Sequence, residues 1–393
     1  MIRTLISAVC LLALANVAPA KDAPLGPEEE KLANQLLGQL GSPSFKARES
    51  ASARLVQFGR AVEPILRKGL ASSDAETRKR CQRLLPLAQQ YELELKIRDF
   101  RTDKNGSASP LPSWARFKQL AGDDEAAREL FIDMHRIDGL FMEELDQKPA
   151  ALRDKFTNRC MEFMQSLNWN PNGLASTQQL AFMLFAALEP KVTNNSPAIS
   201  YFSNGLNMLS THPGGKESLR GDPVIRKLLV KFLLNTDSSA AYNNISLVAN
   251  LELKEGADIA RNLIKLPNRD NWVKMTAIAL LGKIGGKSDI AEIEPFLKDK
   301  TNFGSVQFGN GIQISAQVRD VALGSLVQLT GQNLADYNFP YLKMFGGGAG
   351  GTAGFQFHTS PTMLGFSDEA TRNAAHKKWQ DWREKDKSQE KKP

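Results

Sequence analysis

The strongest constraint on the fold is a spacing that recurs in distant parts of the chain. A basic residue is followed by a small residue three positions later and by a leucine seven positions later. The four copies are Arg48, Ala51 and Leu55; Arg78, Cys81 and Leu85; Lys274, Ala277 and Leu281; and Arg319, Ala322 and Leu326. This spacing puts all three side chains on one face of an α-helix. The small residue lets a partner helix approach closely, and the leucine fills the adjacent groove. The first two copies start 30 residues apart, a period typical of helical solenoids.

Helix caps and turn residues divide the chain into segments. Pro27 is followed by three glutamates, which suits the first turn of a helix. We predict an all-α fold, an α-solenoid of helix pairs with one β-hairpin inserted at about residues 303–317. Its expected parts are N-terminal repeats at 21–102, a linker at 103–113, a central helical block at 114–240, C-terminal repeats at 241–336, a glycine-rich loop at 337–366, a terminal helix at 367–384 and a disordered tail at 385–393.

The hairpin is predicted from a short alternating pattern. Val306 and Phe308 alternate with glutamine, and Ile312 and Ile314 alternate likewise after a Gly-Asn-Gly sequence. A two-residue turn would set Phe308 opposite a glutamine. A three-residue loop sets Phe308 opposite Ile312 and Val306 opposite Ile314, which gives one apolar face. We therefore predict the three-residue form, with Gly311 in the left-handed conformation and the apolar face packed on the last helix pair. The insertion either binds a partner or caps the solenoid.

The first residues have the pattern of a secretory signal peptide. Arg3 precedes an apolar run from Leu5 to Val17, and the run ends in Ala18-Pro19-Ala20. The run is too short to span a bilayer, which disfavours a retained membrane anchor. We expect cleavage after Ala20, a periplasmic or secreted protein, and no membrane span in the mature chain.

Composition limits the classes of partner. The chain is 42% hydrophobic and 24% charged, as in ordinary soluble proteins, and its net charge is +7. Basic residues are interleaved with acidic ones along the expected helices, whereas nucleic-acid binding clusters them on one face. Nucleic acid is therefore not an expected partner. The mature chain keeps Cys81 and Cys160, too few for a disulfide framework, and whether they pair stays open.

Candidate catalytic and cofactor features each have a structural interpretation that is favoured. The glycine run at 346–354 lacks the lysine and hydroxyl residue of a phosphate loop. Asp123, Asp124 and Glu125 precede an apolar-periodic helix, which favours capping over acid–base chemistry. Arg319 and Asp320 are expected to tie stacked repeats together. The four histidines, His135, His212, His358 and His376, show no metal-ligand spacing. We expect no catalytic residue, no metal and no cofactor.

Two groups of residues are candidates for contact with a partner. The first is the hairpin set of Val306, Phe308, Ile312 and Ile314. The second is Trp379 and Trp382, three residues apart on one helical face. These tryptophans could form an aromatic platform for a glycan or peptide, but packing against the last repeat is the favoured interpretation.

These repeats resemble those of HEAT-repeat proteins of the PBS-lyase HEAT-like kind, in particular a group of secreted proteins of planctomycete bacteria. The resemblance is carried by residues 48–85, by 114–134 with Gly122-Asp123-Asp124, by 317–332 with the Arg319-Asp320 pair, and by 365–379. It implies that the repeat positions are structural and that function is binding of other macromolecules along a concave or edge surface. The resemblance implies no reaction.

The expected function is accordingly that of a non-catalytic exported scaffold, which binds another protein or a component of the cell envelope. The alternative is an enzyme or enzyme subunit, lyase-like or hydrolytic, with a site assembled from distant residues. The sequence shows no nucleophile–base pair in favour of that alternative.

Overall fold

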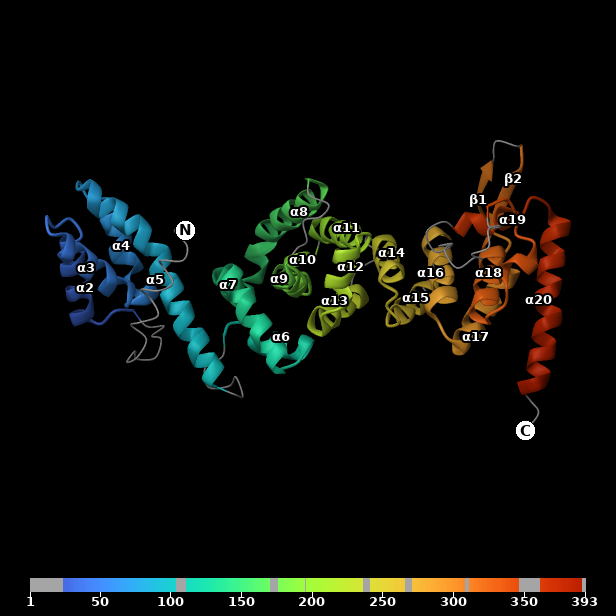
Figure 1. Cartoon of the computed structure of the whole chain (residues 1–393), viewed down its shortest axis with the longest axis horizontal. Coiled ribbons are helices and arrows are strands. Elements are labelled where there is room, and N and C mark those ends of the chain that lie inside the picture. Colours follow the sequence, from blue (N-terminus) through green and yellow to red (C-terminus); the bar gives the residue numbers. More distant parts are fainter. Residues whose placement is uncertain are drawn as a thin grey trace. The chain divides into compact units, whose positions relative to one another are not determined.

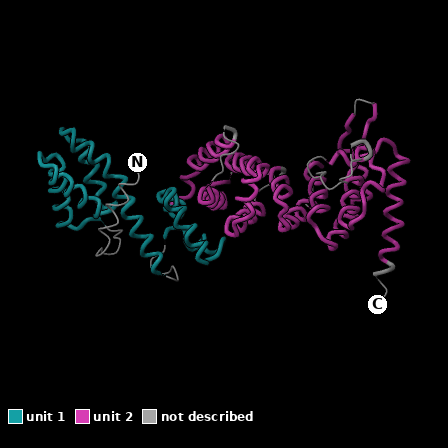
Figure 2. Tube along the Cα trace, viewed as in Figure 1, with its two compact units in different colours: residues 1–147 teal, residues 148–393 magenta. Residues whose placement is uncertain are grey.

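The computed structural model describes residues 24–103, 111–169, 176–194, 196–235, 241–265, 271–307, 311–345 and 361–390. The described chain is helical apart from one two-stranded antiparallel sheet, which confirms the predicted all-α fold with an inserted hairpin (Figure 1). It forms two compact units, unit 1 at residues 1–147 and unit 2 at residues 148–393 (Figure 2). Among the described helices, none is both long and apolar enough to cross a lipid bilayer.

Unit 1 is a stack of helix pairs. Its elements are α2 (Pro27–Gln39), α3 (Phe45–Val56), η2 (Gly59–Val62), α4 (Glu63–Gly69), α5 (Ala75–Thr102), α6 (Trp114–Ala121) and α7 (Glu125–Gln147). Helix α2 packs on α3, α4 packs on α5, and α3 also contacts α5. Of the repeat positions, Ala51, Leu55 and Cys81 are fully buried, whereas Leu85 is half-buried and its neighbour Leu84 lies in the core.

The loops that precede α3 and α5 are built in the same way. The Arg48 guanidinium donates to the carbonyl oxygens of Ser42 at 2.7 Å and Pro43 at 3.1 Å. Thirty residues later, the Arg78 guanidinium donates to the carbonyl oxygens of Ser72 at 2.7 Å and Ser73 at 2.8 Å. Each arginine thus satisfies backbone carbonyls of its own entry loop, and the 30-residue period of the sequence has a direct structural counterpart.

The boundary between the compact units differs from the expected linker. Residues 104–110 lie outside the described part, but the segments on either side of them pack together. Arg128 donates to the carbonyl oxygens of Phe100 at 2.6 Å and Asp103 at 2.9 Å, and the Phe100 and Trp114 rings meet edge to face. Unit 1 ends at Gln147 and unit 2 begins at Lys148, so the boundary in the sequence falls within the expected central block at 114–240.

Unit 2 begins with a set of helices packed in succession. These are η3 (Pro149–Leu152), α8 (Arg153–Trp169), α9 (Thr177–Ala187), α10 (Pro190–Thr193), α11 (Ala198–Ser210), α12 (Pro213–Arg220), α13 (Pro223–Asn235), α14 (Ala241–Leu251), α15 (Gly256–Lys265) and α16 (Asn271–Ile284). Helix α8 packs on α11, α11 on α14, and α14 on α16. Helix α9 is buried at every position from Leu180 to Ala187, as its apolar sequence predicts.

The rest of unit 2 contains the hairpin and the terminal helix. Its elements are η5 (Lys287–Asp289), α17 (Ile290–Ile293), η6 (Glu294–Lys298), β1 (Asn302–Gln307), β2 (Gln313–Gln317), α18 (Val318–Leu329), η7 (Leu334–Tyr337), α19 (Pro340–Phe345), η9 (Pro361–Leu364) and α20 (Glu369–Glu390). Helices α16 and α18 pack so closely that a Cβ at Gly282 would lie 2.7 Å from the Cα of Ser325. The repeat residues Ala277, Leu281, Ala322 and Leu326 are all fully buried.

The predicted disordered tail at 385–393 is wrong for residues 385–390, which continue α20; residues 391–393 lie outside the described part. The charged end of the helix has partners on η6. Arg383 donates to Glu294 at 2.8 Å, and the Lys387 ammonium lies 3.6 Å from the same carboxylate. Arg383 and Lys387 thus both meet Glu294 of η6 near the end of α20.

The hairpin has the predicted register. Val306 pairs with Ile314 and Gln307 pairs with Gln313, while Gly311 has a φ of +81°. Ile314 is buried and Val306 is half-buried, so the apolar face points inward. That face packs on η9, an element that lies between the hairpin and the last helices. The predicted pairing of Phe308 with Ile312 lies outside the described residues, because Phe308 does.

Candidate functional site

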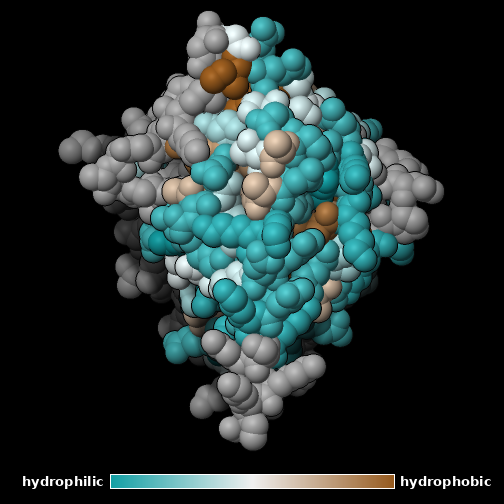
Figure 3. All heavy atoms as spheres, turned by 90° about the vertical axis from the view of Figure 1, so that its right-hand side faces the viewer, coloured by the Kyte–Doolittle hydropathy of each residue, from teal (hydrophilic) through white to brown (hydrophobic). Residues whose placement is uncertain are grey.

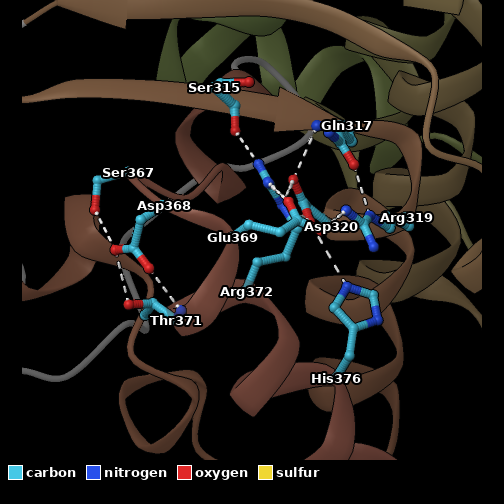
Figure 4. A network of polar contacts seen from close by, with 10 residues as sticks. All are labelled: Ser315, Gln317, Arg319, Asp320, Ser367, Asp368, Glu369, Thr371, Arg372 and His376. Carbon is cyan, nitrogen blue, oxygen red and sulfur yellow. Dashed lines mark hydrogen bonds and ion pairs between the residues drawn. The ribbon is translucent and has the colours of Figure 1, made fainter.

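A cluster of polar contacts near the hairpin lies where β2, α18 and α20 meet (Figure 4). We call Ser315, Gln317, Arg319, Asp320, Glu369 and Arg372 the corner network. Its two acids and two arginines come from the starts of α18 and α20, and its backbone carbonyl comes from β2. Arg319 and Asp320 are neighbours in the sequence at the start of α18. The network joins them to the start of α20, where Glu369 lies 50 residues after Arg319.

Asp320 is the centre of the corner network. Its side chain is 0% exposed, and its Oδ2 accepts the backbone N–H of Gln317 at 2.9 Å, which caps α18. The Nε of Arg372 lies 3.0 Å from Oδ1 and 3.1 Å from Oδ2. A carboxylate removed from water in this way is stable only with a charge partner and hydrogen bonds, and both are present.

Arg372 fixes three elements at once. Its guanidinium donates to Asp320 on α18, to Glu369 on its own helix, and to the Ser315 carbonyl of β2 at 2.8 Å. The side chain is 5% exposed. Burial alone would lower the pKa of Arg372, but the Asp320 charge and the hydrogen bonds to Glu369 and Asp320 outweigh it and raise this pKa. The arginine is therefore a permanent cation that holds α20 against α18 and β2.

Arg319 supplies the second connection between α18 and α20. Its Nε donates to the Gln317 side chain at 2.6 Å, and its Nη2 donates to Glu369 Oε1 at 2.5 Å. The hydrogen bond from Arg319, partly offset by desolvation, lowers the pKa of Glu369. Arg319 and Asp320 thus both act as ties, the role expected from their place in the repeat. The helix that they hold is α20.

His376 lies at the edge of this network, at ion-pair distance from Asp320 when its ring is protonated (Figure 4). Its Nε2 lies 3.6 Å from Asp320 Oδ1, which is too long for a hydrogen bond, and this nitrogen bonds to no described residue. Asp320 is already committed to Arg372 and to the Gln317 N–H. The pair therefore does not have the geometry of an oriented histidine base, in which the carboxylate bonds the ring directly.

The hairpin residues proposed for partner contact have different environments. Ile314 is 1% exposed and belongs to the inner face, and Val306 is half-buried on the same face. Ile312 is 37% exposed, while Phe308 lies outside the described residues. Seen from the C-terminal end of unit 2, the surface is mostly hydrophilic, and hydrophobic atoms appear at the top, at the level of the hairpin (Figure 3). Of the four, Ile312 is the described residue best exposed to a partner.

The two tryptophans are mainly structural. Trp379 is 1% exposed, and its ring lies 5.1 Å from that of the half-buried Trp382. An aromatic platform needs exposed ring faces. Only Trp382 is partly accessible, so the pair fits the packing interpretation better than the platform.

The remaining candidate side chains are occupied by structural contacts. His135 is buried with its Nε2 3.1 Å from the Pro112 carbonyl, and burial lowers its pKa to about 4. Asp124 accepts the Ala127 N–H at 2.9 Å, as a helix cap does. Cys81 and Cys160 are free buried thiols whose pKa values are raised by burial. Among the described residues, no group of three or more His, Cys, Asp or Glu side chains could hold a metal ion. The glycine run at 346–354 and His358 lie outside the described part.

Sequence reasoning missed Arg372, although two signals pointed to it. Arg372, Ala375 and Trp379 repeat the zero, three, seven spacing, with tryptophan in place of leucine. The segment 367–372, Ser-Asp-Glu-Ala-Thr-Arg, also nearly repeats 73–78, Ser-Asp-Ala-Glu-Thr-Arg. The start of α20 therefore has the residue spacing of the predicted repeat helices.

Comparison with protein-family models gives no match to this chain, and no curated protein matches it. In unit 2, Arg372 joins the inserted hairpin, through the Ser315 carbonyl, to Asp320 of α18.

Proposed function

We propose that the chain is an exported, non-catalytic α-solenoid of HEAT-like repeats, which binds another protein or a component of the cell envelope. The observation that carries this proposal is the hairpin, which stands out from the helices of unit 2 (Figure 1). Three contacts hold its base. The element η9 packs under the inner face, Phe366 pairs with β2, and Arg372 donates to the Ser315 carbonyl. A projecting element with a fixed base is pre-organised, so binding would cost little ordering entropy.

The exposed apolar part of the hairpin supports binding as its role. Ile312 is exposed between the turn and β2, while Ile314, two residues later and within β2, is buried. A hairpin that served only to cover the helices needs the buried isoleucine and gains little from the exposed one. Isolated exposed apolar side chains are common on protein surfaces. The role of Ile312 is therefore tested directly by substitution.

Affinity capture from envelope extract, with residues 21–393 as bait, tests the function. Ile312→Ala is expected to reduce capture of the partner and to leave the melting temperature unchanged. The matched control is Ile314→Ala, which removes the same atoms from the core and should lower the free energy of unfolding by about 2–5 kcal/mol. Equal capture by the wild type and Ile312→Ala would move the binding surface away from the turn, and no specific capture by the wild type would refute the scaffold proposal.

Export is tested separately. Residues 1–20 fused to a reporter should carry it out of the cytoplasm, because the segment has the basic start, apolar run and small-residue end of a signal peptide. Replacing Leu11 and Leu12 with arginine in the same fusion interrupts the apolar run and should keep the reporter inside. Retention of the unchanged fusion in the cytoplasm would contradict the proposed export of the protein.

A further inference from the structure

The two edges of the hairpin sheet differ. On the β2 edge, the Ser315 N–H donates to the Phe366 carbonyl and the Phe366 N–H donates to the Ser315 carbonyl, both at 3.0 Å. Arg372 donates to the same Ser315 carbonyl. Within the described residues, no comparable segment pairs with the β1 edge. The sheet is thus closed on one side by its own chain, and only the other side can accept a new strand.

The register shows which backbone groups face outward from β1. Both backbone groups of a residue in an antiparallel strand point to the same side. Ser315 directs its groups to Phe366, so its cross-strand partner Ser305 directs its own groups away from β2. Alternation turns Gln307 outward as well, whereas Val306 faces Ile314. Ser305 and Gln307 are exposed, and no described residue bonds to their outward backbone groups.

Among the described residues, β1 lacks the usual protection of a free edge. Exposed edges are normally blocked by lysine, proline, a bulge or a covering element. Strand β1 reads Asn-Phe-Gly-Ser-Val-Gln, with no charge and no proline, and its bulge is confined to the start, between Asn302 and Gly304. From Gly304 to Gln307 the pairing is regular. The outward groups are therefore presented in the geometry of a sheet.

The residues around the start of β1 define the chemistry of a partner. The rings of Phe303 and Trp272 are 5.2 Å apart and both residues are half-buried, so they offer an apolar contact at the base of the strand. Lys298 and Lys300, both exposed, lie just before β1. Uncharged polar side chains occupy the exposed positions of β1 itself. A complementary segment would be apolar at alternate positions and acidic at the end that meets the lysines.

We infer that β1 binds an extended segment of a partner protein as an added antiparallel strand, with its acidic carboxyl end beside Lys298 and Lys300. This inference rests on the proposed function and names the class of its partner. Main-chain hydrogen bonds to Ser305 and Gln307 supply affinity, and the aromatic pair and the lysines supply specificity and direction. Antiparallel pairing sets the carboxyl end of the segment at the amino end of β1.

The probe is a capped synthetic peptide, Thr-Val-Thr-Val-Thr-Val-Glu-Asp, whose binding to residues 21–393 is measured by fluorescence anisotropy. Two further peptides are N-methylated at alternate amides. One peptide is methylated at the amides that face β1, and the other is methylated at the remaining amides. Methylation of the amides that face β1 should abolish binding, and methylation of the other set should be tolerated. A peptide with the acidic pair moved to its amino end should bind more weakly. These comparisons leave the protein unchanged, so loss of folding cannot imitate the result.

Protein variants test the same edge from the other side. Ser305→Pro removes the outward N–H, which faces solvent, so the hairpin should persist, since proline is tolerated at such edge positions. It should weaken peptide binding about tenfold, the cost of about one hydrogen bond. Ser305→Thr keeps the N–H and serves as the matched control, with unchanged affinity. Replacing Lys298 and Lys300 with glutamate should weaken binding of the acidic peptide and strengthen binding of a peptide that ends in two lysines.

The outcomes separate this inference from the proposed function. Equal binding of both methylated peptides, equal affinity of Ser305→Pro and the wild type, or no saturable binding of any peptide would overturn strand addition. A partner captured equally by the wild type and Ser305→Pro would overturn it too, while leaving the scaffold proposal standing. Peptide binding that follows the expected pattern, with no partner captured from extract, would instead count against the proposed function alone.

Discussion

Helices α5 in unit 1 and α20 in unit 2 begin with nearly the same six residues. The arginine that ends this segment is exposed in α5 and buried in α20. Both starts have an aspartate cap followed three residues later by a threonine. Asp74 accepts the Thr77 N–H at 2.8 Å, and Asp368 accepts the Thr371 N–H at 2.7 Å. In both helices the threonine hydroxyl also donates to the aspartate, at 2.6 Å and 2.9 Å. The local structure of the two starts is thus the same.

The arginine that follows the threonine differs. Arg78 is exposed and donates to carbonyls of its own entry loop, whereas Arg372 is buried on Asp320 of α18. In α5 the buried arginine is Arg80, which donates to Glu49 and Ser52 of α3. The position of the buried arginine follows the position of the carboxylate on the neighbouring helix. Caps are therefore set by local sequence, and buried ion pairs are set by the packing of helices.

The largest expected difference between these helices comes from replacing each arginine. Arg372→Met leaves the Asp320 carboxylate buried without a charge partner, which should cost about 3–5 kcal/mol of stability in unit 2. Arg78→Met, the matched control, removes exposed hydrogen bonds and should cost less than about 1.5 kcal/mol. Hydrogen exchange of peptides from α18 and α20, and from α3 and α5, reports each unit separately. Equal costs in the two units would show that the corner network is not a stabilising tie.

Much of the fold could be predicted because it depends on short-range patterns. The spacing of Ala277 and Leu281, and of Ala322 and Leu326, identified positions that are fully buried. The hairpin register followed from matching apolar residues across a turn, and Val306 does pair with Ile314. Leu85 was a less successful prediction, because the long helix α5 turns Leu84 toward the core instead. A fixed spacing cannot detect such a rotation of a helix about its axis.

The corner network could be predicted only in part. The role of Arg319 and Asp320 as ties followed from their repeat position, but their partners lie 50 and 52 residues away on α20. Arg383 of α20 likewise bonds to Glu294, which lies 89 residues earlier. Such contacts join charges that have no common local pattern, so a single sequence leaves many pairings equally plausible.

A double substitution separates the ion pair from the rest of the network. Asp320→Asn keeps an acceptor for the Gln317 N–H but removes the charge that Arg372 faces. Each single variant should be strongly destabilising, whereas Asp320→Asn combined with Arg372→Met leaves no buried unpaired charge. We expect the double variant to be more stable than the sum of the two singles by about 1–3 kcal/mol, measured by denaturant unfolding. Additive costs would mean that Arg372 stabilises α20 mainly through Ser315 and Glu369.

The smallest expected effect comes from the caps, where the two helices should behave alike. The pKa of Asp74 lies below its ordinary value of 3.8 because of the hydrogen bonds from the side chain and backbone of Thr77. The pKa of Asp368 is lowered by the backbone and then the side chain of Thr371. A lowered folded pKa means that each ionised cap stabilises its helix above pH 3.8 and that this contribution is lost as the pH falls through the folded value. In NMR titrations, the Thr77 and Thr371 amide signals should therefore shift together below pH 3.8, and Asp74→Ala and Asp368→Ala should each abolish the shift in its own helix alone. If only the Thr371 signal moved, the caps would depend on the buried arginine of α20, and the separation between local caps and packing-dependent ion pairs would fail.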